Sequence, residues 1–377
     1  MDASVNRIPS SSDERVFLLS VIINSQSIDI NNSLKELNLL VSTAGGIIVG
    51  NDIIKRKSID PAHIIGQGHI QRIGDLIQEN DIRLVVFDLN NIKPAQVRNL
   101  EEILKCRVIG RTEVILDIFA KRARSAESKI QVELAQLRYI LPRLKGLGGV
   151  LSRLGGGIGT RGPGEKMLET DRRHIQKRIS KLKSKLNKIA KHRQLIRKSR
   201  YGKVLGAVVG YTNDGKSTLI NNLAKDDLFV EDRLFATLDS YTRVVHIEGK
   251  KKILLTDTVG FIRNLPASLI ESFKSTLEEI KNAHFLIHVI DISSYRDIEM
   301  SNQTVEDELI SLGCQNKPRI LFFNKVDSIQ NENIIKAIES RYPDSIIGSA
   351  TTGFGIDQLK MRLNEIYDFF SRIDNAT

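Results

Sequence analysis

The stretch Gly210–Ser217 constrains the fold of this chain more than any other part of the sequence. It reads GYTNDGKS and follows the apolar run Lys203–Val209. A glycine-rich turn between a buried strand and a helix wraps its backbone N–H groups around phosphate oxygens. The helix predicted over Thr218–Leu223 points its positive dipole end at the same anion. An accidental glycine turn is the alternative, and the strand before the turn and the helix after it argue against that alternative.

Side chains of this phosphate loop add charge and metal binding. Lys216 is predicted to meet the β- and γ-phosphates, and the Ser217 hydroxyl is predicted to ligate Mg²⁺. The residues of this segment that are predicted to bind the nucleotide are Gly210, Tyr211, Thr212, Asn213, Asp214, Gly215, Lys216, Ser217 and Thr218.

A second motif follows the predicted strand Ile253–Thr256. It is Asp257-Thr258-Val259-Gly260, with a carboxylate at the end of a buried strand. Such a carboxylate holds Mg²⁺ through water, and the N–H of Gly260 can meet the γ-phosphate. The motif alone is weak, but its position after the phosphate loop strengthens it.

Two more motifs select the base. The strand Arg319–Phe323 ends in Asn324-Lys325-Val326-Asp327. The Asp327 carboxylate can accept the ring N–H and the exocyclic amine of guanine, which favours GTP over ATP. Further on, backbone N–H groups of Ser349-Ala350-Thr351 can meet the guanine carbonyl. Four motifs in this order predict a guanine-nucleotide switch.

A switch segment is expected between the phosphate loop and Asp257. Such a segment needs a hydroxyl that ligates Mg²⁺ when the γ-phosphate is present, and Thr237 and Thr242 both qualify, with Thr237 preferred. Ordinary turn threonines are the alternative. The nucleotide-binding candidates in this segment are Phe235, Ala236, Thr237, Leu238 and Asp239.

The predicted chemistry is hydrolysis of GTP. The candidates for a catalytic role are Lys216, Asn213, Thr237 and Gly260, and the metal ligands are Ser217, Thr237 and, through water, Asp257. Phosphoryl transfer also needs a residue that orients water, and Phe261 after the glycine cannot do this. Slow intrinsic turnover is therefore expected.

The upstream half predicts an α/β domain and a helical hairpin. From residue 16 to 124, short β-like runs alternate with helical stretches, which implies a small, mostly parallel sheet. Apolar residues at spacings of three and four, such as Ile130, Leu134 and Leu137, then predict two antiparallel helices. Pro142 should kink or end the first helix, and a glycine-rich loop is expected from Gly146 to Gly164.

The second hairpin helix is strongly basic. Residues 171–203 carry fourteen lysines and arginines against the single acidic residue Asp171, so their net charge exceeds the +11 of the whole chain. One-signed charge of this density favours RNA or another phosphate polymer, and a solvated face is the alternative. The candidates for RNA contact are Arg153, Arg161, Arg172, Arg173, Lys177 and Arg178.

Length and composition set wider limits. The 377 residues predict a tail over 1–15, an α/β domain over 16–124, the hairpin over 125–200 and the GTPase domain over 201–377. Only Cys106 and Cys314 are present, which suits a reducing cytosol, and no apolar run is long enough to span a membrane. The oligomeric state is open, with a monomer favoured.

Several segments together resemble the HflX family of ribosome-associated GTPases. The segments are GYTNDGKSTLINNL, LFATLD, DTVGFIRNLP, NKVD and SA, with QVELAQLRYILPRL and GGGIGTRGPGEKMLETDRR upstream. The resemblance covers roughly residues 66–370 and implies an N-terminal α/β domain with a helical hairpin, joined to a P-loop GTPase domain with a mainly parallel sheet and helices on both faces. It also implies binding to the large ribosomal subunit, with GTP-dependent rescue or splitting of ribosomes.

The resemblance has departures. The family usually has Ala at Asp214, Lys at His69 and Asp at Gly110. The last two weaken the case for a second nucleotide in the N-terminal domain. A carboxylate at Asp214 should disfavour phosphate by on the order of 1 kcal/mol unless it points to solvent.

Several functional questions stay open from the sequence. Asn213 lies where K⁺-dependent GTPases carry a ligand for the ion, so K⁺ joins Mg²⁺ as an expected cofactor. The expected partners are GTP or GDP and the large ribosomal subunit. The alternatives are a GTPase acting on tRNA modification or RNA folding, and a non-hydrolysing, nucleotide-gated RNA-binding protein.

Overall fold

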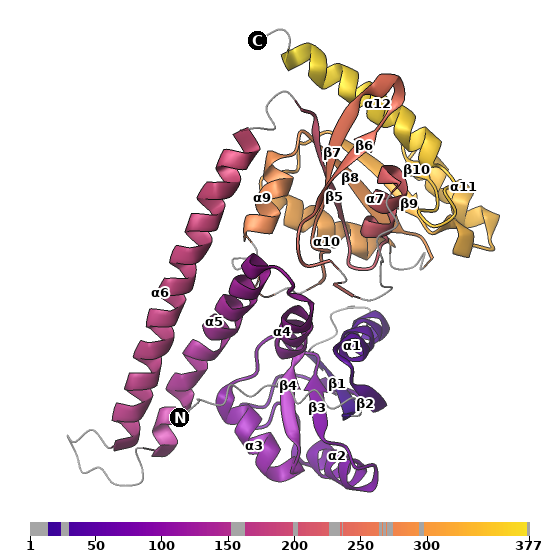
Figure 1. Cartoon of the computed structure of the whole chain (residues 1–377). Coiled ribbons are helices and arrows are strands. Elements are labelled where there is room, and N and C mark those ends of the chain that lie inside the picture. Colours follow the sequence, from indigo (N-terminus) through magenta and orange to yellow (C-terminus); the bar gives the residue numbers. More distant parts are fainter. Residues whose placement is uncertain are drawn as a thin grey trace. The chain divides into compact units, whose positions relative to one another are not determined.

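A computed structural model describes residues 14–23, 30–151, 163–198, 203–225, 234–235, 237–263, 266, 269, 274–293 and 298–374 (Figure 1). The chain divides into two compact units. The N-terminal unit comprises Met1–Lys121, Lys129–Lys185 and Pro266–Ser268, and the C-terminal unit comprises Arg122–Ser128, Leu186–Leu265 and Leu269–Thr377. The domain boundaries expected from the sequence, at residues 15/16, 124/125 and 200/201, remain a prediction.

The N-terminal unit contains a four-stranded sheet in the order β2-β1-β3-β4, with all pairs parallel. The strands are β1 (Arg15–Ile23), β2 (Ile47–Arg56), β3 (Leu84–Phe87) and β4 (Arg107–Gly110). The helices that alternate with them are α1 (Ile30–Ala44), α2 (Gln67–Glu79), α3 (Pro94–Leu104) and α4 (Arg111–Arg122). The predicted small α/β layer with parallel strands is confirmed.

The core of this sheet follows from helical and strand periodicity. In α2, Ile70, Ile73 and Ile77 repeat at three and four residues and are all buried. They pack in one cluster with Val85 and Phe87 of β3. A one-sided apolar helix on a buried parallel strand is the arrangement that such sequences favour.

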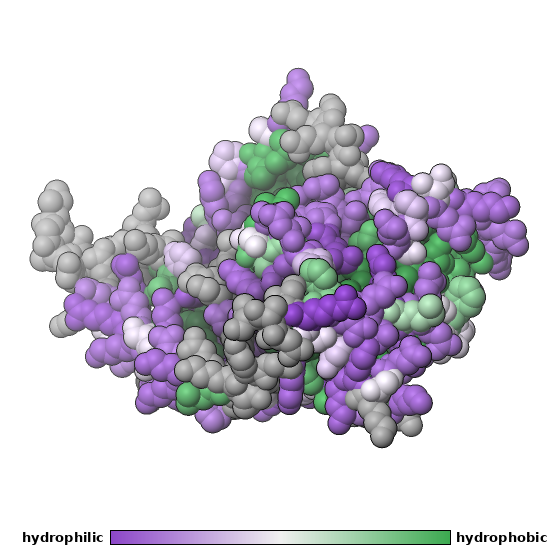
Figure 2. Space-filling view, turned by 90° about the horizontal axis from the view of Figure 1, so that it is seen from above, coloured by the Kyte–Doolittle hydropathy of each residue, from purple (hydrophilic) through white to green (hydrophobic). Residues whose placement is uncertain are grey.

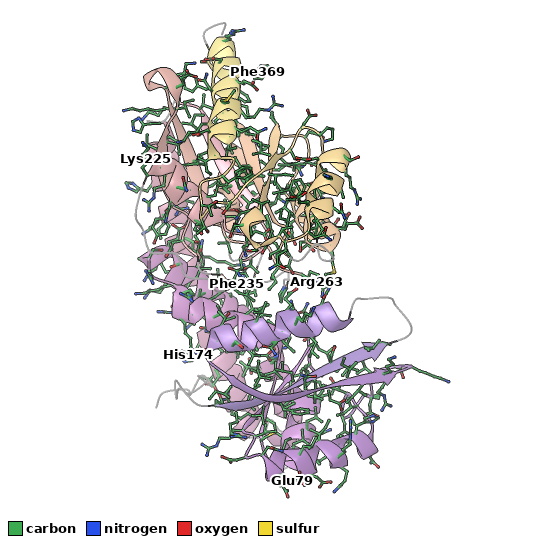
Figure 3. All side chains as sticks on the ribbon, turned by 90° about the vertical axis from the view of Figure 1, so that its right-hand side faces the viewer. Glu79, His174, Lys225, Phe235, Arg263 and Phe369 are labelled. Carbon is green, nitrogen blue, oxygen red and sulfur yellow. The ribbon has the colours of Figure 1, made fainter. Side chains whose placement is uncertain are left out.

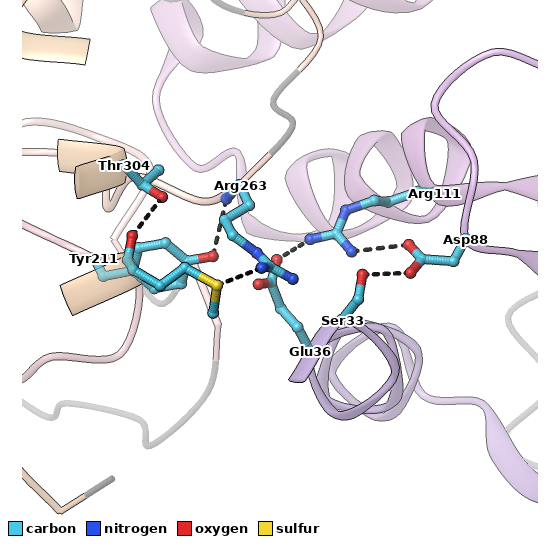
Figure 4. A network of polar contacts seen from close by, with 8 residues as sticks. Ser33, Glu36, Asp88, Arg111, Tyr211, Arg263 and Thr304 are labelled. Atoms are coloured by element: carbon cyan, nitrogen blue, oxygen red, sulfur yellow. Dashed lines mark hydrogen bonds and ion pairs between the residues drawn. The ribbon is translucent and has the colours of Figure 1, made fainter. Parts of the chain in front are cut away.

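A buried ion-pair network lies at the carboxyl ends of β3 and β4 (Figure 4). The Arg111 side chain is 1% exposed. Its guanidinium donates to Glu36 and, at 3.1 Å, to Asp88 Oδ1. The other Asp88 oxygen accepts from the Ser33 hydroxyl at 2.5 Å. Because each buried charge has a partner of opposite sign, the network ties α1 and α4 to the sheet.

The two hairpin helices are α5 (Ala126–Leu151) and α6 (Pro163–Lys198). α5 continues past Pro142 to its end at Leu151. The expectation of a helix end at Pro142, with a loop from Gly146, is therefore wrong, and the alternative expectation of a kink at Pro142 remains a prediction. The φ angle that proline fixes is a helical one, so a proline inside a helix removes one backbone hydrogen bond without requiring the chain to leave the helix.

The hairpin helices run antiparallel in the N-terminal unit, as predicted. Leu134 of α5 and Ile179 and Leu182 of α6 are buried. Above this seam, the Arg178 guanidinium donates two hydrogen bonds to the Glu133 carboxylate, at 2.6 and 2.9 Å. Among the described residues of the N-terminal unit, the predicted apolar seam and this bidentate ion pair thus connect the two helices.

The C-terminal unit contains a six-stranded sheet in the order β10-β9-β8-β5-β7-β6. β6 pairs antiparallel with β7, and the other pairs are parallel. The strands are β5 (Leu205–Gly210), β6 (Thr242–His246), β7 (Lys252–Asp257), β8 (Phe285–Asp291), β9 (Arg319–Asn324) and β10 (Ile346–Ile347). The helices are α7 (Lys216–Ala224), α9 (Lys274–Asn282), α10 (Ile298–Ser311), α11 (Glu332–Arg341) and α12 (Ile356–Asp374).

Helices cover both faces of this sheet (Figure 1). On one face, Val208 packs in a cluster with Leu219 of α7 and Leu359 of α12. On the other face, Val209 packs in a cluster with Leu277 of α9 and Val305 of α10. Because neighbouring residues of β5 are buried on opposite faces, its sequence is apolar throughout. The expected doubly covered, mainly parallel sheet is confirmed.

The face of the described residues that Figure 2 draws is mostly polar. Figure 2 shows hydrophilic side chains over most of the drawn face, with smaller hydrophobic areas between them. Within the described parts of the chain, no helix has the length and apolar character needed to cross a membrane.

We predict that Arg111→Met destabilises the protein by about 3–5 kcal/mol, because it removes the buried guanidinium that pairs with the carboxylates of Glu36 and Asp88. Urea denaturation followed by circular dichroism measures the free energy of unfolding. The control is Arg83→Ala, which removes an exposed ion pair with Asp81 and should change stability by less than about 0.5 kcal/mol. Equal losses in the two variants would contradict the structural role of Arg111.

Candidate functional site

A cavity of about 570 Å³ lies where the phosphate loop, the switch segment and the loops after β7, β8, β9 and β10 meet. It is lined by Thr212, Asn213, Gly215, Lys216, Ser217, Thr218, Phe235, Thr237, Thr258, Gly260, Ser293, Asn324, Lys325, Asp327, Ser328 and Thr351. Parallel strands bring their carboxyl ends to one edge of a sheet, which is where α/β proteins bind ligands. Residues from all four predicted motifs and from the switch segment therefore meet at one cavity.

The phosphate loop turns sharply from β5 into α7. Gly215 has φ +89°, and a Cβ atom there would lie 2.3 Å from Asn324 Nδ2. Glycine is therefore required both by the backbone conformation and by the close neighbour. The turn leaves the first N–H groups of α7 directed at the cavity end of the helix, where they can bind an anion.

Lys216 is buried at the start of α7. Its Nζ donates to the Tyr211 carbonyl at 2.6 Å, across the loop. Burial lowers the pKa of Lys216, and the nearby charges of Asp214 and Asp257 oppose that shift. A phosphate in the cavity would add further negative charge beside the ammonium and favour its charged form.

Three oxygen-bearing side chains converge beside Lys216. Ser217 Oγ lies 2.5 Å from Asp257 Oδ2 and 2.6 Å from Thr237 Oγ1. Burial raises the pKa of Asp257. Within the described residues, its buried Oδ1 atom has no hydrogen-bond partner. Mg²⁺ prefers such hydroxyl, carboxylate and water oxygens, so this donor set fits the ion.

The segment after β7 is hydrogen-bonded to the phosphate loop. Thr212 N donates to the Phe261 carbonyl at 2.7 Å, and Phe261 N donates to the Gly210 carbonyl at 3.1 Å. Arg263 N donates to the Tyr211 hydroxyl at 2.9 Å (Figure 4). These bonds hold the segment that carries Gly260 against the loop.

Gly260 lines the cavity, whereas the side chain of Phe261 is buried in the core. A Cβ on Gly260 would lie 2.6 Å from Thr212 Cα and 2.8 Å from Lys216 Nζ, so a larger residue does not fit. The Phe261 side chain is 3% exposed and packs in the core cluster with Val209. It does not line the cavity. A phenyl ring buried there cannot orient an attacking water.

The side chain of Asn324 joins two loops at the end of the cavity that is predicted to hold guanine. Its Nδ2 donates to the Asp214 carbonyl at 2.8 Å, and its Oδ1 accepts from Ala350 N at 2.8 Å. Ser349 N donates to the Phe354 carbonyl, so the predicted role of this loop in meeting guanine falls to groups such as Thr351, which lines the cavity. That role remains a prediction.

Lys325 and Asp327 lie beside this bridge. Lys325 adopts the left-handed conformation with φ +68°, and its Nζ pairs with Asp291 Oδ2 at 2.6 Å. The exposed side chain of Asp327 lines the cavity, where a carboxylate can accept the two guanine donors. This position suits the predicted preference for guanine over adenine, which remains a prediction.

Asp214 points neither to solvent nor into the cavity. Its side chain is 6% exposed, and Oδ2 accepts from Tyr211 N at 2.8 Å. Burial, together with the nearby Asp291 carboxylate, raises the pKa of Asp214 to about 7, although Lys216 and Lys325 act in the opposite direction. The sequence analysis expected the Asp214 carboxylate to disfavour phosphate unless it points to solvent. Because the carboxylate is buried, that exception does not apply.

Not every predicted residue lines the cavity. The described nucleotide-binding candidates that do not line it are Gly210, Tyr211, Asp214, Leu238, Asp239, Asp257, Val259, Val326, Ser349 and Ala350. Three predicted residues, Ala236, Arg153 and Arg161, lie outside the described residues. Asp239 instead contacts Ser125, at the start of α5.

The sequence reasoning missed two cavity residues, Ser293 and Ser328. Ser328 comes directly after Asp327. Ser293 comes two residues after β8, a strand that pairs with β5. The run Phe285–Ile290, apolar except for His288, was a usable signal, because a buried strand next to the phosphate-loop strand ends at the same edge.

Three family models match consecutive parts of the chain. A model described as GTP-binding GTPase N-terminal matches residues 31–120, and one described as GTP-binding GTPase Middle Region matches residues 122–200. A third, described as 50S ribosome-binding GTPase, matches residues 206–325.

Individual relatives extend this similarity over most of the chain. The GTPase HflX of Caldanaerobacter subterraneus subsp. tengcongensis is 46% identical over 92% of this chain and 79% of its own length. The GTPase HflX of Lacrimispora saccharolytica is 49% identical over 92% of this chain and 81% of its own length. The crystal structure of an SsGBP and GDP complex has a TM-score of 0.50 and 25% identity, over 95% of this chain and 99% of that one.

We predict that Asp214→Asn tightens GTP binding by about fivefold at pH 8, where the wild-type carboxylate is charged. The fold favours the protonated form, because the pKa is raised to about 7. The contribution of Asp214 to stability is therefore full below the unfolded pKa and falls as the pH rises to about 7. At pH 6 the carboxyl is mostly neutral, so the gain in affinity should shrink.

Titration with a fluorescent GTP analogue at both pH values measures this effect. The matched control is Asp344→Asn, which changes an exposed carboxylate outside the cavity and should leave both affinities unchanged. Weaker binding by Asp214→Asn, or the same ratio at both pH values, would show that the buried charge does not oppose the nucleotide.

Proposed function

Because this chain belongs to the HflX family of GTPases, we propose that it uses GTP binding and hydrolysis to control its association with the large ribosomal subunit, as in ribosome splitting or rescue. As a member of that family it binds guanine nucleotides and hydrolyses GTP. The observation that carries the proposal is a row of exposed lysines on α6 in the same chain as a cavity lined by residues of the four predicted nucleotide motifs.

The residues of the site divide the chemistry among them. The backbone of the phosphate loop and Lys216 would hold the β- and γ-phosphates, and the backbone N–H of Gly260 would meet the γ-phosphate. Ser217 and Thr237 would hold Mg²⁺ directly and Asp257 through water. When bound, the ion neutralises charge that develops on the phosphate oxygens.

Burial of Phe261 supports slow intrinsic hydrolysis. The side chain packs in the core, so the attacking water needs a group from elsewhere to orient it. A binding partner that supplies or orders such a group would accelerate turnover. We therefore expect large ribosomal subunits to stimulate GTP hydrolysis, and equal rates with and without subunits would contradict this.

The basic surface of α6 supports a phosphate-polymer partner. Lys177, Lys181 and Lys185 are all exposed, and their spacing of four residues keeps them on one face of the helix. Arg178 instead makes its ion pair with Glu133, and Arg173 pairs with Glu169. These three lysines, of which Lys177 was among the predicted RNA contacts, are therefore stronger candidates for contact with rRNA phosphates than Arg173 and Arg178. Arg172 remains a candidate.

We predict that replacing Lys177, Lys181 and Lys185 together by glutamate weakens binding to 50S subunits by roughly tenfold or more and lowers the salt dependence of binding. Cosedimentation with 50S particles across a salt series, under GTP, GDP and a non-hydrolysable GTP analogue, measures both. The wild-type protein should cosediment best in the GTP and analogue states.

The matched control replaces three exposed lysines outside this row by glutamate and should change binding much less. These lysines are Lys57, Lys105 and Lys336. Binding that is the same in all nucleotide states would contradict nucleotide-controlled association. Binding to isolated tRNA or rRNA fragments as tight as to whole subunits would favour the alternative of a GTPase that acts on RNA modification or folding.

A monovalent ion is the second expected cofactor. Asn213 lines the cavity and adopts the left-handed conformation with φ +70°. We predict that GTP hydrolysis is several-fold faster in KCl than in NaCl of equal strength, and that Asn213→Ala removes the difference while GDP still binds. Equal rates in the two salts for the wild-type protein would show that K⁺ has no role.

A further inference from the structure

The switch segment of the C-terminal unit is attached to the beginning of α5. Ser125, the residue before α5, donates from its hydroxyl to Asp239 Oδ1 at 2.5 Å. Its backbone N–H donates to Asp239 Oδ2 at 3.2 Å. The two oxygens of one carboxylate are thus bound by one residue that lies 114 positions away in the chain.

The same serine caps the helix. Ser125 Oγ accepts from Ser128 N at 3.0 Å, while the Ser128 hydroxyl donates to the Ser125 carbonyl at 3.1 Å. The Ser125 hydroxyl can therefore donate its single proton to Asp239 and accept the N–H of Ser128 at the same time. The Asp239 carboxylate also lies at the N-terminus of a 26-residue helix, where the helix dipole favours a negative charge.

Asp239 is two residues from Thr237, whose hydroxyl lies against Ser217. The beginning of the switch segment is held separately. Phe235, labelled in Figure 3, has φ +55°, and its backbone N–H donates to Thr212 Oγ1 at 2.8 Å. The Thr237 hydroxyl is thus held at the nucleotide site between an anchor on the phosphate loop and an anchor on α5.

The beginning of α5 is in turn joined by an ion pair to α6, near the C-terminal end of that helix. Glu127 Oε2 lies 2.8 Å from Arg193 Nη2, and both residues belong to the C-terminal unit. A change in the position of Asp239 therefore acts on the first turn of α5, and that turn is connected by an ion pair to the second hairpin helix. The switch segment thus contacts the N-terminal end of α5 through Ser125, and that end contacts α6 through the ion pair of Glu127 with Arg193.

We infer that Asp239 and Ser125 form a positioning pair that holds Thr237 in its magnesium-binding position and couples the nucleotide state to the hairpin helices. Neither residue lines the cavity, so the pair acts through Thr237. The inference rests on the proposed role of Thr237 as a ligand used in the GTP state. The pair should therefore affect binding of GTP more than binding of GDP.

The test exchanges the donor and the acceptor of this contact in the full-length protein. Ser125→Asp keeps a good helix cap but places a second carboxylate against Asp239. Adding Asp239→Asn supplies an amide that can donate to the new carboxylate and still accept the backbone N–H. A cap-only role for Ser125 predicts that both variants behave like the wild type.

The readout is the affinity for a non-hydrolysable GTP analogue relative to GDP, measured with Mg²⁺ present. We expect Ser125→Asp to weaken analogue binding by about tenfold, the scale of one charge-assisted hydrogen bond, with GDP binding unchanged. The double variant should recover most of the loss. Melting temperatures, together with unchanged GDP affinity, establish that the variants are folded.

Thr237→Ala is the reference that separates the two proposals. If Thr237→Ala loses analogue affinity but Ser125→Asp does not, or if the double variant is no better than Ser125→Asp, the positioning pair is overturned. If Thr237→Ala itself binds the analogue and GDP as the wild type does, the proposed magnesium role of Thr237 fails, and the positioning role fails with it.

Discussion

The nucleotide site depends on the amide of Asn324, which is 2% exposed and bonded at both ends. One end holds the phosphate loop through the Asp214 carbonyl, and the other holds the loop after β10 through Ala350 N. The buried amide has no access to water, so losing either bond would leave a polar group unsatisfied at a cost of about 1–3 kcal/mol. The loops predicted to contact phosphate and base are thereby joined to each other in the protein without nucleotide.

Much of this arrangement could be predicted from local sequence. The phosphate loop, Asp257 and Asn324 each follow an apolar strand, and parallel pairing brings the carboxyl ends of such strands to one edge. Periodicity also predicted the buried faces of the hairpin, because Leu134, Ile179 and Leu182 lie on one side of their helices. These features depend on neighbours in sequence or on rules that apply to every sheet of this class.

Other features depended on contacts that no local pattern encodes. Ser125 and Asp239 are 114 residues apart, and nothing in either segment indicates the other. The orientation of Asp214 likewise depended on the backbone N–H of Tyr211, which donates to the carboxylate inside the loop. The course of α5 past Pro142 shows the same limit, since a proline permits both a helix end and a continued helix.

The buried carboxylate of Asp214 gives the loop a property that its motif alone does not have. The loop must attract phosphate, yet it keeps an ionisable acid beneath the backbone that forms the cradle. Lys216 and Lys325 favour the charged form of that acid, whereas burial and Asp291 favour the neutral form. A bound triphosphate would add negative charge near the loop, so it should favour the neutral form further. Nucleotide binding is then linked to uptake of a proton, and affinity should fall as the pH rises past the pKa of the carboxyl group.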